Sequence, residues 1–176
     1  MEAKTINTVK DLYEEFIRDI YNAEILLVPE LQFFAEKVVT KELKRALTQH
    51  VEKTNAHITR LEEIQEDLQS DMLQEHCRTM KEMIKEIKGL VDRCSGEKLT
   101  ERAVVGSLHR LTHCMITVYQ MLVSMADELD LEQQKHFLQQ NLDDEIQFDK
   151  AINAYGFTIL LQEFTPKKGY HEPKKR

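Results

Sequence analysis

The sequence has few of the residues that interrupt helices, and it has no tryptophan. Five glycines and three prolines occur among 176 residues, and Pro166 and Pro173 both lie near the C-terminus. Runs of β-branched residues are short. These scarcities argue against a fold of many short strands joined by tight turns, and they predict a small number of long helices.

Cysteine is scarce as well, and long apolar runs are missing. Cys77, Cys94 and Cys114 are odd in number and show no Cys-x-x-Cys spacing, which predicts free, mostly packed thiols in a reducing compartment. The apolar stretch "AEILLVPELQFF" is interrupted by Pro29 and by glutamates, so it is too short and too charged to span a membrane. The N-terminus is polar and acidic, so we expect no signal peptide and a cytoplasmic protein.

The charge balance argues against a general nucleic-acid-binding protein, because the net charge is −7. Positive charge gathers only in the tail, residues 166–176, which we interpret as disordered. A weak contact between this tail and an acidic partner is the alternative. Residues 1–165 are expected to form one soluble globular domain, since 41% of the chain is hydrophobic and 31% is charged.

Apolar residues recur at helical spacing in five segments. We predict long helices over about 9–34, 40–68, 101–129 and 131–164, and a shorter helix within 70–94. A proline at position 29 should kink or end the first of them. The connections within the first and last pairs of long helices are short, whereas the middle connection is long. The predicted fold is therefore all-α: a ferritin-like four-helix bundle with one additional short helix in the crossover.

Four carboxylates lie on or beside the apolar stripes of three of these helices: Glu24, Glu52, Glu145 and Asp149. Carboxylates are rarely buried unless they are paired, protonated or bound to a metal. The spacing alone leaves two interpretations open. Either these are boundary residues in contact with water, or they converge on one site in the middle of the bundle.

The chain resembles the YciE/YciF family of ferritin-like proteins over residues 4 to about 160. The resemblance rests on the segments "KTINTVKDLYEEFIRDIYNAE", "ALTQHVEKTNAHITRLEEI", "CRTMKEMIKE", "HCMITVYQML" and "NLDDEIQFDKAI". It implies a ferritin-like bundle that is commonly dimeric and linked to stress responses, with a carboxylate-rich metal site at its centre. By this resemblance Glu24, Glu52, Glu145 and Asp149 match acidic ligand positions of the family, and Glu52 is the first residue of a Glu-x-x-His motif.

Three ligand positions depart from the family pattern. Asn55 stands where the family has histidine, and Thr112 and Met115 stand where it usually has glutamates. An amide oxygen and a thioether are poor ligands for iron or manganese, so we predict a degenerate, metal-free di-iron site. If any ion binds, we expect a single Fe, Mn, Mg or Ca ion. Without an ion, the buried carboxylates must pair with neighbouring polar groups or share protons, which would raise their pKa values.

Other groups lead to plainer predictions. His109 and His113 have a spacing that can hold a metal on a helix, but we expect them to be surface or boundary residues. His50 and His57 flank an apolar stripe and are assigned no catalytic role. The methionine-rich segment 72–83 is expected to fill the core or to form a dimer interface. We recognise no activated nucleophile and no phosphate-binding loop.

These observations predict a non-enzymatic homodimer with a structural or partner-binding role, linked to stress. The alternative is an enzyme in which Glu24, Glu52, Glu145 and Asp149 hold one ion and perform oxidase, peroxidase or catalase-like chemistry. No membrane association is expected under either interpretation, and the sequence names no substrate.

Overall fold

The computed structural model of the protein describes residues 5–69 and 77–164. Within these ranges the chain forms five α-helices and no strand, which confirms the all-α prediction. The helices are α1 (Val9–Lys37), α2 (Lys41–Asp67), α3 (Arg78–Asp92), α4 (Glu97–Glu128) and α5 (Glu132–Phe164). The predicted basic tail and the start of the methionine-rich segment lie outside the described residues.

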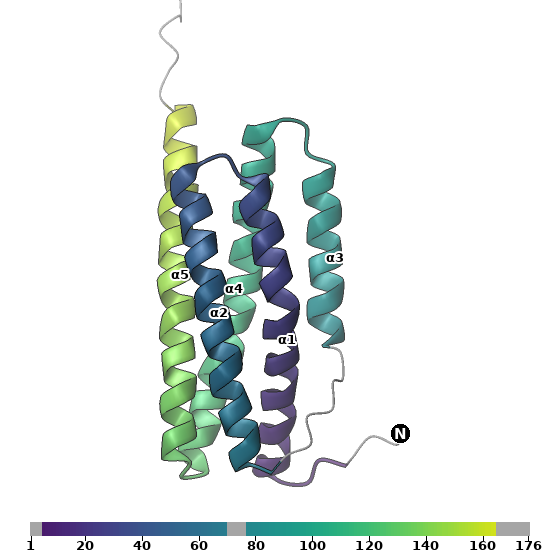
Figure 1. The fold of residues 1–176 in the computed structure, drawn as a ribbon, viewed down its shortest axis with the longest axis vertical. Coiled ribbons are helices and arrows are strands. Elements are labelled where there is room, and N and C mark those ends of the chain that lie inside the picture. Colours follow the sequence, from purple (N-terminus) through teal and green to yellow (C-terminus); the bar gives the residue numbers. More distant parts are fainter. Residues whose placement is uncertain (1–4, 70–76, 165–176) are drawn as a thin grey trace, which may run out of the picture.

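Two antiparallel hairpins make up the bundle. Figure 1 shows α1 beside α2 and α4 beside α5, and the hairpins pack together through α1 against α4 and α2 against α5. The shorter α3 lies in the connection between the hairpins and packs on α1 and α4. This crossover returns the chain to the end of the bundle at which α2 began, so α2 and α4 run in the same direction. The arrangement is the predicted ferritin-like one.

The core is built from large apolar side chains of all five helices. Those that are almost completely buried include Tyr13, Ile17, Ile20, Phe34, Leu43, Leu47, Leu61, Ile64, Ile87, Leu108, Met115 and Tyr119. Burying a side chain of this kind stabilises the fold by roughly 1.5–3 kcal/mol, so this shared core is the main source of stability. Met80 is also buried, which confirms the predicted core role for that member of the methionine-rich segment.

The first helix begins where the sequence predicts and continues past Pro29 to within three residues of its predicted end. Thr8 and Asp11 form a capping box: the Thr8 hydroxyl accepts from the Asp11 amide at 3.0 Å, and the Asp11 carboxylate accepts from the Thr8 amide at 3.1 Å. The helix then continues through Pro29 to Lys37. The lost donor at Pro29 is therefore tolerated, because residues on either side of it, such as Leu27 and Leu31, are buried in the core.

The second helix is capped by a distant side chain rather than by its own first residues. The Thr40 side chain makes no cap hydrogen bond to α2. Instead Glu101 of α4 reaches across, and its Oε1 accepts from the amides of Val39 at 2.8 Å and Thr40 at 2.6 Å. The carboxylate thus places negative charge at the positive end of the α2 dipole and joins α2 to α4.

A buried histidine and carboxylate cluster as the candidate site

Polar side chains from all four long helices meet inside the bundle. Glu24 of α1, His57 of α2, Tyr119 of α4 and Glu145 of α5 are each at most 1% exposed. Nδ1 of His57 lies 3.0 Å from Oε1 of Glu24 and 3.7 Å from Oε1 of Glu145. The Tyr119 hydroxyl donates to the same Glu24 oxygen at 2.5 Å. The cluster therefore centres on the shared oxygen of Glu24, which faces two donors.

A second carboxylate of α5 extends the cluster toward the surface. Nε2 of His57 lies 3.4 Å from Oδ2 of Asp144. Asp144 also contacts cationic groups, with its Oδ1 3.1 Å from Nζ of Lys53 and its Oδ2 3.7 Å from a guanidinium nitrogen of Arg60. Arg60 in turn donates to Oδ1 of the buried Asn141 at 2.8 Å. The imidazole of His57 is thus flanked by a carboxylate on each side.

These surroundings favour the charged form of the imidazole. Burial by itself lowers the pKa of His57, but the negative charge of Glu24 and the contacts with Asp144 and Glu145 outweigh it and raise the pKa to about 9. The contact with His57 lowers the pKa of Asp144 to about 2, with a further contribution from Lys53. At neutral pH the cluster therefore contains an imidazolium among carboxylates.

Tyr119 stays protonated in this environment. Burial and the adjacent charge of Glu24 raise the pKa of its phenol well above the usual value. Its hydroxyl donates to Glu24 and accepts from Nδ2 of Asn141 at 3.2 Å. The phenol therefore acts as a fixed donor that links α1, α4 and α5.

His50 connects the cluster to an open groove between α2 and α5. Its ring stacks on Phe148 with centroids 3.7 Å apart and planes within 8° of parallel. Its Nε2 lies 3.3 Å from Oε1 of Glu145. The groove has a volume of about 440 Å³, and Glu52 is one of the residues that line it. His50 thus both lines this groove and contacts Glu145.

The structure brings together two of the four candidate carboxylates and places the other two elsewhere. Glu24 and Glu145 meet at His57 as described above. Glu52 is exposed and lies in the groove, away from His57. Asp149 belongs to a separate cluster on the face between α4 and α5. Glu52 precedes His57 by five residues, which places it about 140° away around the helix.

The motif in α2 was assigned to the wrong residues. Asn55, taken to replace the ligand histidine, is exposed, and its side chain donates to the Val51 carbonyl at 2.8 Å. The inward line of α2 instead contains His50, Thr54 and His57, all buried. These three polar residues recur at helical spacing on the same side of α2 as its buried leucines, and this spacing could have identified the inner face. A search for apolar residues alone does not detect it. His57, assigned no role from the sequence, is the central residue of the site.

The described side chains do not fit a di-iron centre. Such centres in ferritin-like bundles use a Glu-x-x-His motif on each of two helices and a glutamate on each of the other two. Here α2 has Thr54 and His57 at that spacing, and α5 has Glu145 and Phe148, so each helix offers only one of the two ligands of such a motif. Glu24 remains in α1.

The fourth helix offers no replacement. Thr112 and Met115 of α4 are both buried on its inner side, as the resemblance placed them, but neither is a carboxylate. Three ligand groups remain, from Glu24, His57 and Glu145, with ligand atoms within 4.8 Å of one another. That number is too small for two bridged iron ions, although it equals the number of protein ligands in many single-ion sites.

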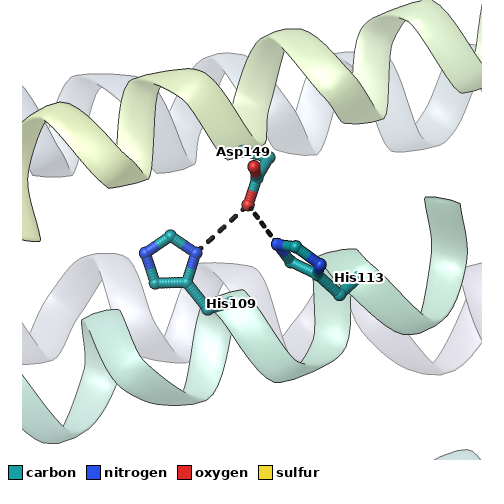
Figure 2. A group of neighbouring side chains, drawn as sticks. All are labelled: His109, His113 and Asp149. Atoms are coloured by element: carbon teal, nitrogen blue, oxygen red, sulfur yellow. Dashed lines mark hydrogen bonds and ion pairs between the residues drawn. The ribbon is translucent and has the colours of Figure 1, made fainter.

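A second group of metal-ligating side chains lies outside the core. Figure 2 shows the carboxylate of Asp149 on α5 directed between the rings of His109 and His113 on α4. Oδ1 of Asp149 is 3.1 Å from Nδ1 of His109 and 3.0 Å from Nε2 of His113. The prediction that the two histidines are surface or boundary residues is confirmed, since His113 is 65% exposed and His109 is 26% exposed.

Two of the three cysteines, Cys77 and Cys114, carry no activated thiolate. All three are free, as predicted. Burial is the main cause that raises the pKa of Cys77 to about 11, and it also raises the pKa of Cys114. Both thiols are therefore protonated at neutral pH and poor nucleophiles. In the described part of the chain no helix combines the length and apolar character needed to cross a bilayer.

Comparisons with known proteins agree with this fold. Residues 8–164 match the model of a family described as a domain of unknown function (DUF892). The chain is similar to Protein YciF of Escherichia coli strain K12, with 22% identity over 141 residues that cover 80% of this chain and 85% of that protein.

Two solved structures are also similar. YcfI from Rhodopseudomonas palustris, described as a candidate structural protein, superposes with a TM-score of 0.82 and 27% identity over 87% of this chain and 98% of its own. The E. coli stress protein YciF superposes with a TM-score of 0.84 and 20% identity over 89% and 99% of the two chains. At that identity the second likeness shows the shared fold alone.

Proposed function

Because this chain belongs to the DUF892 family, whose function is unknown, we propose from its own side chains that it is a structural, partner-binding protein without enzyme activity. In this proposal the di-iron site has degenerated into a metal-free cluster that holds the four long helices together. The protein would act as a homodimer in the cytoplasm. A link to stress is proposed from the description of one structural neighbour as a stress protein.

The position of His57 is the observation that carries this proposal. A protonated imidazole beside Glu24 supplies positive charge where a di-iron site would place metal ions. The imidazole reaches two further carboxylates, Glu145 at 3.7 Å and Asp144 at 3.4 Å. The neighbouring carboxylates are therefore compensated from within the protein, without a cation from solution.

The alternative function, a metal-dependent enzyme, has one observation in its favour. Glu24, His57 and Glu145 are all buried, and each offers a ligand atom within 4.8 Å of the others. Oε2 of Glu24 accepts no hydrogen bond from the described protein groups. If His57 lost its proton, these three groups would suit a single Fe or Mn ion, as an oxidase, peroxidase or catalase-like enzyme would require.

Elemental analysis separates the two functions. Tag-free protein would be purified without chelators as the parent, as Glu145→Gln and as His113→Gln, the last of which disables the surface cluster. We expect well under one Fe or Mn per chain in all three. We also expect a thermal midpoint that neither EDTA nor added Fe²⁺ or Mn²⁺ changes in the His113→Gln protein.

The opposite pattern would overturn the proposal. Close to one Fe or Mn per chain in the parent and in His113→Gln, lost in Glu145→Gln, would place an ion at the buried cluster and favour the enzyme. Sedimentation of the parent tests the dimer separately, and a monomer across the micromolar range would contradict that part.

A further inference from the structure

The cluster on the face between α4 and α5 combines two imidazoles and one carboxylate, which are ligand types of transition-metal sites. His109 and His113 are four residues apart, so their rings lie on the same side of α4. A single oxygen of Asp149 faces a nitrogen of each ring, at 3.1 and 3.0 Å. Three ligand groups therefore converge from two helices that pack directly against each other.

The distances from Asp149 to the two histidine nitrogens are close to those between neighbouring ligands of a tetrahedral ion. Zinc binds imidazole nitrogen and carboxylate oxygen at about 2.0–2.2 Å, which puts neighbouring ligand atoms of a tetrahedron about 3.3–3.5 Å apart. The two distances from Asp149 are only a few tenths of an ångström shorter. Rotation of the exposed His113 side chain alone can supply part of that difference, because its ring is 65% exposed.

The carboxylate is held in place by a further contact. Nδ2 of Asn153, one turn along α5, donates to Oδ2 of Asp149 at 3.0 Å. This leaves Oδ1 directed at the histidines. Outer contacts of this kind orient carboxylate ligands in known metal sites. Asp149 itself is 17% exposed, so its carboxylate is partly shielded from water while the exposed edge of His113 leaves access from solution.

We propose that His109, His113 and Asp149 bind one divalent transition-metal ion of the zinc class, with water in the fourth position. Two imidazoles and one carboxylate favour Zn²⁺, Cu²⁺ or Ni²⁺ over Mg²⁺ and Ca²⁺, which prefer oxygen ligands throughout. This site is separate from the buried cluster, and it requires no assumption about the function proposed above.

Calorimetric titration with Zn²⁺ tests the site. Tag-free, chelator-free parent protein is compared with His113→Gln and Asp149→Asn, and Co²⁺ titration monitors tetrahedral coordination through visible absorption. We expect one Zn²⁺ per parent chain. Each variant should weaken binding by at least about tenfold, the lower limit for loss of an outer contact in known sites.

Two matched variants serve as controls. His136→Gln removes an exposed histidine of α5 whose described hydrogen-bond partner is Gln140, and it should leave Zn²⁺ affinity unchanged. Glu145→Gln, within the buried cluster, should also leave it unchanged. Since His113 is exposed, its substitution should not impair folding, which circular dichroism would verify.

The proposal has clear contrary outcomes. Equal Zn²⁺ affinity in the parent and in His113→Gln, or the absence of saturable binding in the parent, would overturn it. Binding that is lost in Glu145→Gln but kept in His113→Gln would also overturn it, because the ion would then lie in the core.

Discussion

Nδ1 of His57 lies 3.0 Å from Oε1 of Glu24, and neither side chain has any exposed surface. This contact joins α2 to α1 across the centre of the bundle. A charged pair that is fully removed from water stabilises a fold only when its remaining polar atoms are also paired. Here Tyr119 adds a second donor to the same Glu24 oxygen, and Asp144 approaches the far nitrogen of the ring, whereas Oε2 of Glu24 accepts no hydrogen bond from the described residues. The pair is therefore one part of a larger network.

Removal of the imidazole should be costly. In His57→Gln the buried Glu24 loses its cationic partner, and breaking such a pair typically costs about 3–5 kcal/mol. Urea denaturation at pH 7 and one fixed protein concentration would measure the change in unfolding free energy. The exposed His136→Gln serves as control and should change it by less than about 0.5 kcal/mol. Equal effects of the two substitutions would contradict the central role given to His57.

The same residue should make stability depend on pH in the alkaline range. The pKa of His57 rises from 6.5 in the unfolded chain to about 9 in the folded protein, so the folded state binds the proton more tightly. This contribution is fully present below pH 6.5 and is lost as the pH rises through about 9. We expect the unfolding free energy of the parent to fall across this window.

Denaturation curves recorded from pH 6 to 10 would test that dependence. The decline should be shallower in His57→Gln and unchanged in His136→Gln, because only the first variant lacks the buried imidazole. A parent protein whose stability is constant between pH 6.5 and 9 would show that folding does not raise the pKa of His57.

Much of the fold could be predicted because it depends on local patterns. Thr8 and Asp11 mark the start of α1, and the scarcity of glycine and proline indicates long helices. The crossover followed from the lengths of the connections alone. The sequence left open whether Pro29 kinks α1 or ends it, and the helix continues because burial of the residues around it outweighs the loss of one hydrogen bond.

The site was only half predictable, because it depends on the rotation of each helix. Glu24 and Glu145 stand within strongly apolar surroundings and were found. Asp149 follows Glu145 by four residues, which turns it about 40° around the helix, enough to face His109 instead of the core. His57 was missed because the inward residues of α2 near it are polar, and a pattern of apolar residues does not reveal them. Contacts between distant segments, such as Glu101 with Thr40, have no local signature at all.

The Tyr119 hydroxyl should contribute measurably to stability. Tyr119→Phe leaves the ring in place but removes the donor to Glu24 and the acceptor for Asn141. Loss of one partner from a buried polar group costs about 1–3 kcal/mol. Tyr21→Phe is the matched control, because its hydroxyl donates to Glu62 at 3.1 Å in a partly exposed position. Thermal and urea unfolding should rank Tyr119→Phe as the more destabilised, and the reverse order would refute the role of this hydroxyl.

Substitutions of Glu101, which caps the start of α2, should destabilise the protein to different degrees. Glu101→Ala leaves the amides of Val39 and Thr40 without their acceptor, at a cost of about 1–3 kcal/mol. Glu101→Gln keeps an acceptor oxygen but loses the charge that favours the helix N-terminus, so its cost should be smaller. The exposed Glu63→Gln controls for loss of a negative charge elsewhere.

Amide hydrogen exchange would locate the effect. Exchange should accelerate at the start of α2 in Glu101→Ala, less in Glu101→Gln, and not in the control. Uniform acceleration over all helices would instead mean that Glu101 supports the core in general rather than this helix end.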